Sequence, residues 1–125
     1  SLEQTALREA NEEIGLDPTN VKLFGSLAKI PVISGFELNA FVGRLLEDTE
    51  LYPGDSEVQR VLFVPLEALL EEAAWRTENR EWRGEEFKLH FFDHEGDVIW
   101  GATARLVDLL LKLLRERHQD VRELL

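Results

Sequence analysis

The sequence predicts a single α+β domain in which helices cover the faces of a mixed β-sheet, an αβα arrangement. Its 125 residues suffice for one hydrophobic core and leave little room for a second. Amphipathic helical segments stand near both ends of the chain, and strand-like segments alternate with turn signals between them. This order, with mostly hairpin-like connections, is typical of a layered α+β domain.

The first expected element is a helix at the N-terminus. Ser1 and Gln4 have the spacing of a capping box, and Gly15 with Pro18 behind it predicts the end of the helix. Small and apolar residues recur every four positions and predict a narrow stripe that packs against a sheet. The stripe consists of Leu2, Ala6, Ala10 and Ile14.

Strand-like segments follow the first helix. Residues 21–33 are rich in β-branched and aliphatic side chains, with Gly25 and Pro31 predicting a bulge or an irregular edge. A Ser-Gly turn signal separates them from a second expected strand at 36–46. Residues 47–57 are expected to form an acidic loop. The further expected elements are a strand at 58–64, a short helix at 66–75, an exposed polar loop at 76–85, a strand at 86–92, a short return strand at 98–100 and a helix at 102–117.

The last expected helix has a leucine-rich face. We expect this face to lie in the core, with a helix-mediated homodimer as the alternative. Trp100 and Gly101, just before this helix, are expected to provide core packing and a tight strand-to-helix turn. The cations of the polar loop alternate with glutamates and are expected to form surface ion pairs. These cations are Arg76, Arg80, Arg83 and Lys88.

The strongly acidic composition restricts the ligands. Fourteen Lys and Arg against 25 Asp and Glu give a formal net charge of −11. A chain with this charge repels a phosphate backbone, which disfavours nonspecific binding to nucleic acid. If the substrate is itself a polyanion, a cation must mediate between the two, and a divalent metal is the obvious candidate.

The absence of cysteine excludes disulfides, thiolate zinc sites and cysteine nucleophiles. It is compatible with a reducing compartment, and we expect a cytoplasmic location. The apolar stretches are much shorter than a bilayer span, so we expect no membrane-spanning helix. The first residues are polar, which is unlike a signal peptide.

Residues 8–16 are the most informative stretch. On a helix, Glu9 and Glu13 lie one turn apart on the same face, Glu12 lies beside them, and Arg8 can hold the Glu12 carboxylate. Two carboxylates about 6 Å apart repel by roughly 2–3 kcal/mol at an effective dielectric near 20. A divalent cation that prefers oxygen ligands, Mg²⁺ or Mn²⁺, would offset this repulsion. The alternative is a solvated helix face of the kind that many surface helices present.

The whole string resembles the second half of the Nudix hydrolase signature, Arg-Glu-apolar-x-Glu-Glu-x-Gly-apolar. The matching residues are Arg8, Glu9, Ala10, Glu12, Glu13, Gly15 and Leu16. The first half of the signature requires a Glu eight residues before the Arg and a Gly six residues before that Glu, and both positions precede Ser1. The resemblance therefore implies one partial Nudix domain over residues 1–125, an αβα sandwich truncated at the start of the Nudix helix and lacking its N-terminal strands. Whether such a fragment is active stays open.

Three further strings resemble the coenzyme A diphosphatase branch of this family. They are Gly35-Phe36 through Phe41-Val42-Gly43, Glu57-Val58-x-x-Val61-x-x-x-Pro65-Leu66, and Ile99-Trp100-Gly101-x-Thr103-Ala104. The resemblance implies metal-dependent hydrolysis of a nucleoside-linked diphosphate, with coenzyme A giving 3′,5′-ADP and 4′-phosphopantetheine. The alternatives are a Nudix hydrolase of a nucleotide sugar or dinucleotide polyphosphate, and a nucleotide-binding module without turnover.

The resemblance also implies roles for individual residues. Glu9 and Glu13 would be the main ligands of Mg²⁺ or Mn²⁺, Glu12 an additional ligand or the catalytic base, and Arg8 the residue that orients the carboxylates. A further catalytic acid would come from a distant loop, for which Glu57 is the candidate. The alternative for Glu57 is an ordinary charge at the edge of a loop or strand.

Overall fold

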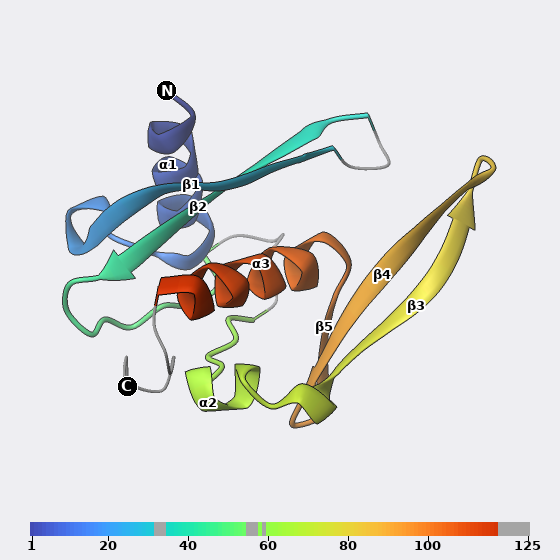
Figure 1. The fold of residues 1–125 in the computed structure, drawn as a ribbon. Helices are drawn as coiled ribbons and strands as arrows, with labels where there is room; N and C mark the ends of the chain where they lie inside the picture. The colour runs from blue at the N-terminus through green and yellow to red at the C-terminus, as the bar shows by residue number, and fades with distance from the viewer. Residues whose placement is uncertain (32–34, 55–57, 59, 118–125) are drawn as a thin grey trace. The chain divides into compact units, whose positions relative to one another are not determined.

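The computed structural model describes residues 1–31, 35–54, 58 and 60–117. The chain divides into two compact units, Ser1–Phe63 and Val64–Leu125. Each unit combines helix and antiparallel strands (Figure 1), which confirms the α+β class. No helix in the described part of the chain is both long enough and apolar enough to cross a membrane. That the whole chain is a single domain stays a prediction.

The first unit begins with helix α1 (Leu2–Ile14). The capping box predicted from the sequence is formed, because the Ser1 hydroxyl accepts a hydrogen bond from the Gln4 amide at 3.2 Å and the Gln4 side chain accepts one from the Ser1 amino group. Gly15 ends the helix with φ of 72°, a left-handed conformation that glycine adopts without steric cost. The apolar stripe is partly buried, although Leu2 is exposed.

One turn of 3₁₀ helix (Pro18–Asn20) leads from α1 into strand β1 (Val21–Pro31). β1 pairs antiparallel with β2 (Glu37–Leu45), as their short connection requires. The register shifts on either side of Gly25, which confirms the predicted irregularity there. The two strands expected from the sequence are therefore present, although residues 32–34, at the end of the first expected strand, lie outside the described residues.

An open pocket of about 330 Å³ lies where α1 faces β1 and β2. It is lined by Ala6, Leu7, Ala10, Leu16, Val21, Leu23, Asn39, Phe41, Gly43, Leu45 and Leu51. The Asn39 Oδ1 atom in this apolar lining is buried and has no hydrogen-bond partner among the described residues. Native proteins seldom leave a buried oxygen without a partner, so the Asn39 side chain is an unfavourable feature of this lining.

The prediction of a strand at residues 58–64 is wrong for the part of this segment that the structure describes. Val58 and residues 60–64 belong to no strand. Leu62 and Phe63 are 41% and 66% exposed, so they have no buried sheet face to occupy. Their β propensity reflects what fits a half-buried pleated surface, and without a partner strand it does not produce a strand.

The second unit begins with helix α2 (Leu66–Leu69) and one turn of 3₁₀ helix (Glu72–Ala74). The helix expected at 66–75 is therefore too long. The Trp75 indole N–H donates to the Leu69 carbonyl at 2.8 Å, which satisfies a carbonyl at the end of α2. Trp75 itself already belongs to the next strand.

Three antiparallel strands follow in sheet order β3 (Trp75–Trp82), β4 (Glu85–His94) and β5 (Asp97–Trp100). The prediction of a polar loop at 76–85 is wrong, because most of these residues form β3. Arg83 and Gly84 have φ of 49° and 79°, the combination that a two-residue hairpin turn requires, and β3 and β4 then pair residue by residue. The expected mixed sheet is thus described as two sheets whose pairings are all antiparallel.

The predicted surface ion pairs are formed by Arg76 and Arg80 of β3, whereas the described residues include no ion pair of Arg83 or Lys88. Arg76 pairs with Glu78 at 3.0 Å and with Asp93 at 3.3 Å, and Arg80 also pairs with Glu78. The Arg83 guanidinium lies over the Trp82 ring, 4.3 Å from its centroid. These cations are therefore engaged locally, as surface ion pairs usually are.

Helix α3 (Gly101–Arg117) packs on β4 and β5 and provides the core of this unit. Phe92, Ala104 and Leu111 are at most 2% exposed. The face expected in the core is buried only in part, since Leu113 is 40% exposed and the other expected core residues are half-buried: Leu106, Val107, Leu109, Leu110 and Leu114. Gly101 makes the tight turn into the helix with φ of 67°. Trp100, however, is 61% exposed, and its expected core role is wrong.

The position of Trp100 follows from strand alternation. Ile99 pairs with the buried Phe92, whereas Trp100 pairs with Phe91. Because neighbouring residues of a strand point to opposite faces, Trp100 lies on the face opposite Phe92.

Candidate functional site

The acidic residues predicted as metal ligands lie along one stretch of α1. Glu9 and Glu12 are exposed and Glu13 is half-buried. Glu12 and Glu13 belong to the last turn of the helix, which contains no basic residue. Because the C-terminal end of a helix carries partial negative charge, two carboxylates there strengthen the negative potential. The end of α1 therefore favours a cation.

The structure brings the carboxylates onto one helix but does not complete a metal centre. Among the residues that the structure describes, no group of three or more Asp, Glu or His side chains is arranged to hold a metal ion. Glu57, the candidate for a further acid, lies outside the described residues. Additional ligands would have to come from outside this set, as is usual for Mg²⁺, which retains waters and binds substrate phosphates.

Arg8 is exposed on α1. Within the described part of the chain, no ion pair joins Arg8 to Glu12. The contact expected from their spacing is therefore not formed, in keeping with the small stabilisation that exposed helix pairs provide. The role of Arg8 in orienting the carboxylates stays a prediction.

A segment of the acidic loop lies against the end of α1. The Tyr52 amide donates to the Ile14 carbonyl at 3.1 Å, and the Gly54 amide donates to the Glu13 carbonyl at 2.6 Å. Both acceptors are among the last carbonyls of the helix, which have no partner within it. We call residues 51–54 the strap. The fold thus places the strap against the turn that carries two of the predicted ligands.

The contact between strap and helix depends on two glycines. A Cβ atom added to Gly54 would lie 2.6 Å from the Glu12 carbonyl oxygen, so no other residue fits without movement. On the helix side, a Cβ atom added to Gly15 would lie 2.9 Å from the Tyr52 ring. The sequence analysis placed Gly54 only within an acidic loop and missed this contact, because the sequence does not show which distant backbone a glycine touches.

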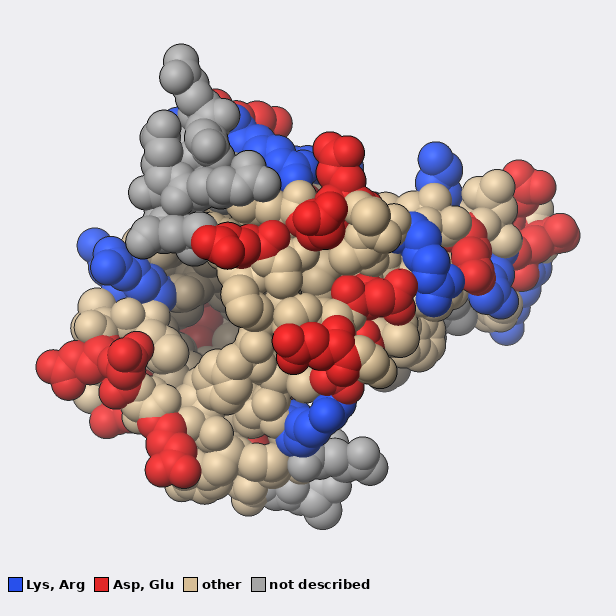
Figure 2. Space-filling view, turned by 90° about the horizontal axis from the view of Figure 1, so that it is seen from below, with Lys and Arg blue, Asp and Glu red and all other residues tan. Residues whose placement is uncertain are grey.

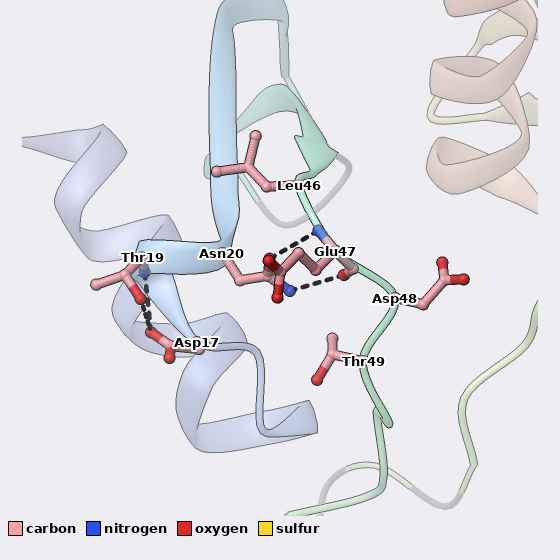
Figure 3. A pocket seen from close by; sticks show the side chains of 7 residues that line it. All are labelled: Asp17, Thr19, Asn20, Leu46, Glu47, Asp48 and Thr49. Carbon is pink, nitrogen blue, oxygen red and sulfur yellow. Dashed lines mark hydrogen bonds between the residues drawn. The ribbon is translucent and has the colours of Figure 1, made fainter.

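A second feature of the first unit is an open polar pocket of about 370 Å³ (Figure 3). It is lined by Asp17, Thr19, Asn20, Leu46, Glu47, Asp48 and Thr49. The Asn20 side chain makes two 2.9 Å hydrogen bonds with the backbone of Glu47. Asp48 points away from Asp17 in Figure 3. The pocket therefore joins the start of β1 to the chain that leaves β2, and its carboxylates do not converge.

Asp17 caps the 3₁₀ turn in this pocket. Its carboxylate accepts hydrogen bonds from the Thr19 amide at 2.9 Å and the Thr19 hydroxyl at 2.8 Å. The bond from the backbone amide is the larger cause, and both bonds lower the pKa of Asp17 because they favour the charged form. Asp17 is thus a local structural carboxylate.

Acidic side chains occur in several separate places on the face shown in Figure 2, with basic side chains between some of them. On this face the acidic side chains do not gather in a single patch. A general negative potential attracts cations to the molecule without selecting a site. The selection must come from local geometry, and the metal-binding role of α1 stays a prediction.

These features define an α+β protein with an acidic helix whose end is held by a loop. Residues 1–95 match the model of the NUDIX domain, a match that runs across both units. The chain belongs to the NUDIX domain family.

Curated relatives agree with this membership. The chain is 40% identical over 121 residues to Nudix hydrolase 15, mitochondrial, of Arabidopsis thaliana, covering 90% of this chain and 42% of the relative. It is 41% identical over 111 residues to Nudix hydrolase 22, chloroplastic, of the same plant, covering 82% and 36%. It is 27% identical over 117 residues to the uncharacterized Nudix hydrolase NudL of Pectobacterium atrosepticum, covering 94% and 61%.

The chain therefore spans less than two thirds of the length of each of these relatives. The names of the two plant relatives place them in mitochondria and chloroplasts. The expected cytoplasmic location is accordingly not confirmed.

Proposed function

We propose that this chain provides the metal-binding helix of a pyrophosphohydrolase that cleaves a nucleoside-linked diphosphate. The observation that carries the proposal is the last turn of α1, where Glu12 and Glu13 stand at the negative end of the helix. Negative side chains at this end of a helix are unfavourable, and a bound cation would offset that cost. The same turn belongs to the string that resembles the family signature, and it lies inside the region that matches the NUDIX model.

The donor set fits a hard divalent cation. Carboxylate oxygens are the ligands that Mg²⁺ and Mn²⁺ prefer, so Glu9 and Glu13 would hold the ion and Glu12 would be an additional ligand or the base. When bound, the ion supplies positive charge for the phosphate oxygens and for the attacking water. Arg8 would orient the carboxylates. Glu57 is proposed as a further acid, and it follows the strap residue Gly54 by three positions in the sequence.

The chain's own residues would then do the following. If Glu12 is the base, its carboxylate oxygen accepts a proton from water as the water oxygen bonds to phosphorus. The bond between that phosphorus and the bridging oxygen breaks, and the two halves of the diphosphate leave as separate phosphates. The exposure of Glu12 leaves its carboxylate accessible to water and substrate.

Coenzyme A or a derivative is the proposed substrate, with 3′,5′-ADP and 4′-phosphopantetheine as products. The support is the three sequence strings that resemble the coenzyme A diphosphatase branch, of which the string that opens α3 is the most suggestive. The alternatives are another diphosphate, such as a nucleotide sugar or a dinucleotide polyphosphate, and a nucleotide-binding module without turnover.

The test is a product assay on the full chain with Mg²⁺ or Mn²⁺ and a panel of these substrates. We expect release of 3′,5′-ADP from coenzyme A, and loss of that release in Glu13→Gln. Glu3→Gln is the matched control, because Glu3 is exposed in the first turn of the same helix and is far from the predicted ligands. Activity that survives Glu13→Gln would contradict the ligand assignment. Calorimetric binding of Mg²⁺ and substrate without product would instead favour the binding module.

We also propose that any homodimer forms through α3. Its face is largely buried at Leu111, while Leu113 is 40% exposed and available for a contact between copies. Light scattering after size exclusion should give twice the 14.4 kDa chain mass, and Leu113→Glu should restore the monomer. A dimer that is insensitive to this substitution would exclude the α3 face.

A further inference from the structure

The strap meets the helix at the two residues that follow the exposed Glu12. Its amides donate to the Glu13 and Ile14 carbonyls. These bonds bring positive N–H dipoles to the negative end of α1, whose last turn carries Glu12 and Glu13. We propose that the strap is a positioning element for the carboxylates of α1, and that Gly54 is the residue on which its fit depends. The inference rests on the proposed function, because its purpose is to hold metal ligands in place.

Gly54 is required by contact and not by its backbone conformation. Its φ lies outside the left-handed region, so alanine could adopt its conformation. The obstacle is the backbone of α1, since a Cβ atom at position 54 would lie 2.6 Å from the Glu12 oxygen and 3.3 Å from the Glu13 oxygen. A backbone oxygen cannot rotate away as the end of a side chain can. Alanine must therefore move either the strap or the last turn of the helix.

Movement at this point reaches the predicted ligands directly. The oxygens that the added methyl would strike belong to Glu12 and Glu13 themselves. The last turn of a helix frays when its carbonyl groups lose their partners. Because ligand groups must be held close to their productive geometry, loss of supporting contacts typically costs 10–100-fold in metal affinity.

Tyr52 of the strap contacts the end of α1 with both its ring and its backbone amide. Its ring lies 2.9 Å from the point where a Gly15 Cβ would be, while its amide bonds to Ile14. The glycine that ends α1 thus also makes room for the strap. Tyr52 as a whole is 55% exposed, so burial alone does not account for its position against the helix end.

The experiment measures Mn²⁺ affinity of the full chain from the electron paramagnetic resonance signal of free Mn²⁺. Gly54→Ala should raise the Kd at least about tenfold. Gly43→Ala is the matched control, because it is in β2 of the same unit and its Cβ would meet the movable side chains of Leu23 and Val21. Its Kd should stay within about twofold of the original chain. Circular dichroism melts of all variants establish that each is folded.

A second readout separates positioning from general loss of structure. At saturating Mn²⁺, Gly54→Ala should lower kcat for diphosphate hydrolysis while KM for the substrate stays unchanged. A folded Gly54→Ala chain with unaltered Mn²⁺ affinity would overturn the inference. If Gly54→Ala does not fold, Tyr52→Ala replaces it, because it removes the ring and keeps both amides. It should raise the Kd about threefold or more, and an unchanged Kd would overturn the inference.

Failure of the proposed function has a different signature. If the original chain binds no Mn²⁺, the metal-binding role fails and the inference fails with it. Hydrogen exchange then tells whether the strap itself is real, since the Tyr52 and Gly54 amides should exchange slowly in the original chain and quickly in Gly54→Ala. Slow exchange without Mn²⁺ binding identifies the proposed function as the part that failed.

Discussion

Glu9→Gln should stabilise the protein without metal and remove its stabilisation by metal. Glu9 lies three and four residues before Glu12 and Glu13 on α1. Like charges at these spacings destabilise a helix by about 0.2–0.5 kcal/mol per pair. Removing two such pairs should therefore raise the free energy of unfolding by about 0.4–1 kcal/mol in a chelator.

Added Mn²⁺ should make the original chain more stable than Glu9→Gln, the reverse of the order expected in a chelator. At 100 times its Kd, a ligand that binds only the folded state adds about 2.7 kcal/mol to its stability. The original chain should gain this amount, and Glu9→Gln, lacking a main ligand, should gain far less. Urea unfolding followed by circular dichroism, with chelator or with Mn²⁺, measures both quantities.

Glu3→Gln is the control for charge on the same helix. Glu3 is in the first turn, where a carboxylate favours the helix, so its neutralisation should cost about 0.3–1 kcal/mol in both conditions. The reasoning is refuted if Glu9→Gln destabilises the protein in chelator. It is equally refuted if Mn²⁺ stabilises the original chain and Glu9→Gln by the same amount.

Three further predictions concern stability. Asn39→Leu should raise the free energy of unfolding by about 1–3 kcal/mol, because it replaces a buried acceptor that has no described partner by an apolar group among the apolar residues of the pocket under α1. A lower denaturation midpoint would show that the Asn39 oxygen has a partner. Leu111→Ala should cost about 2–5 kcal/mol and Leu113→Ala much less, since only Leu111 is buried; equal costs would contradict the packing of α3. The Asp17 carboxylate has a lowered pKa, so its contribution to the free energy of unfolding is present above the ordinary pKa near 3.8 and is lost as the pH falls through the lower folded value. In a pH series of unfolding measurements, Asp17→Asn should lose less stability in acid than the original chain. An identical loss of stability would contradict the hydrogen bonds from Thr19.

Local rules were sufficient for the helices that begin and end at strong signals. The capping box at Ser1 and Gln4 and the left-handed Gly15 define α1 from residues within one turn of each end. The turn into α3 at Gly101 is equally local. The ligand pattern of α1 was available for the same reason, because helical spacing alone places Glu9, Glu12 and Glu13 along one stretch.

The errors arose where the outcome depends on a partner distant in sequence. The charged segment of β3 has little strand character, and its pairing follows from the turn at Arg83 and Gly84 together with the strong strand β4. Residues 60–64 have strand character, and in the described part of the chain they belong to no strand. Gly54 shows the same limit at the candidate site. The need for glycine at this position comes from the backbone of α1, which lies too close to leave room for a side chain.

The central claim is that the carboxylates of α1 hold a divalent cation. Paramagnetic broadening of assigned amide signals by substoichiometric Mn²⁺ tests it most directly, because broadening falls steeply with distance from the ion. The account predicts that the signals of Glu9, Glu12 and Glu13 disappear first while that of Glu3 persists. Broadening centred on Asp17 and Glu47, or spread evenly over the acidic surface, would contradict it.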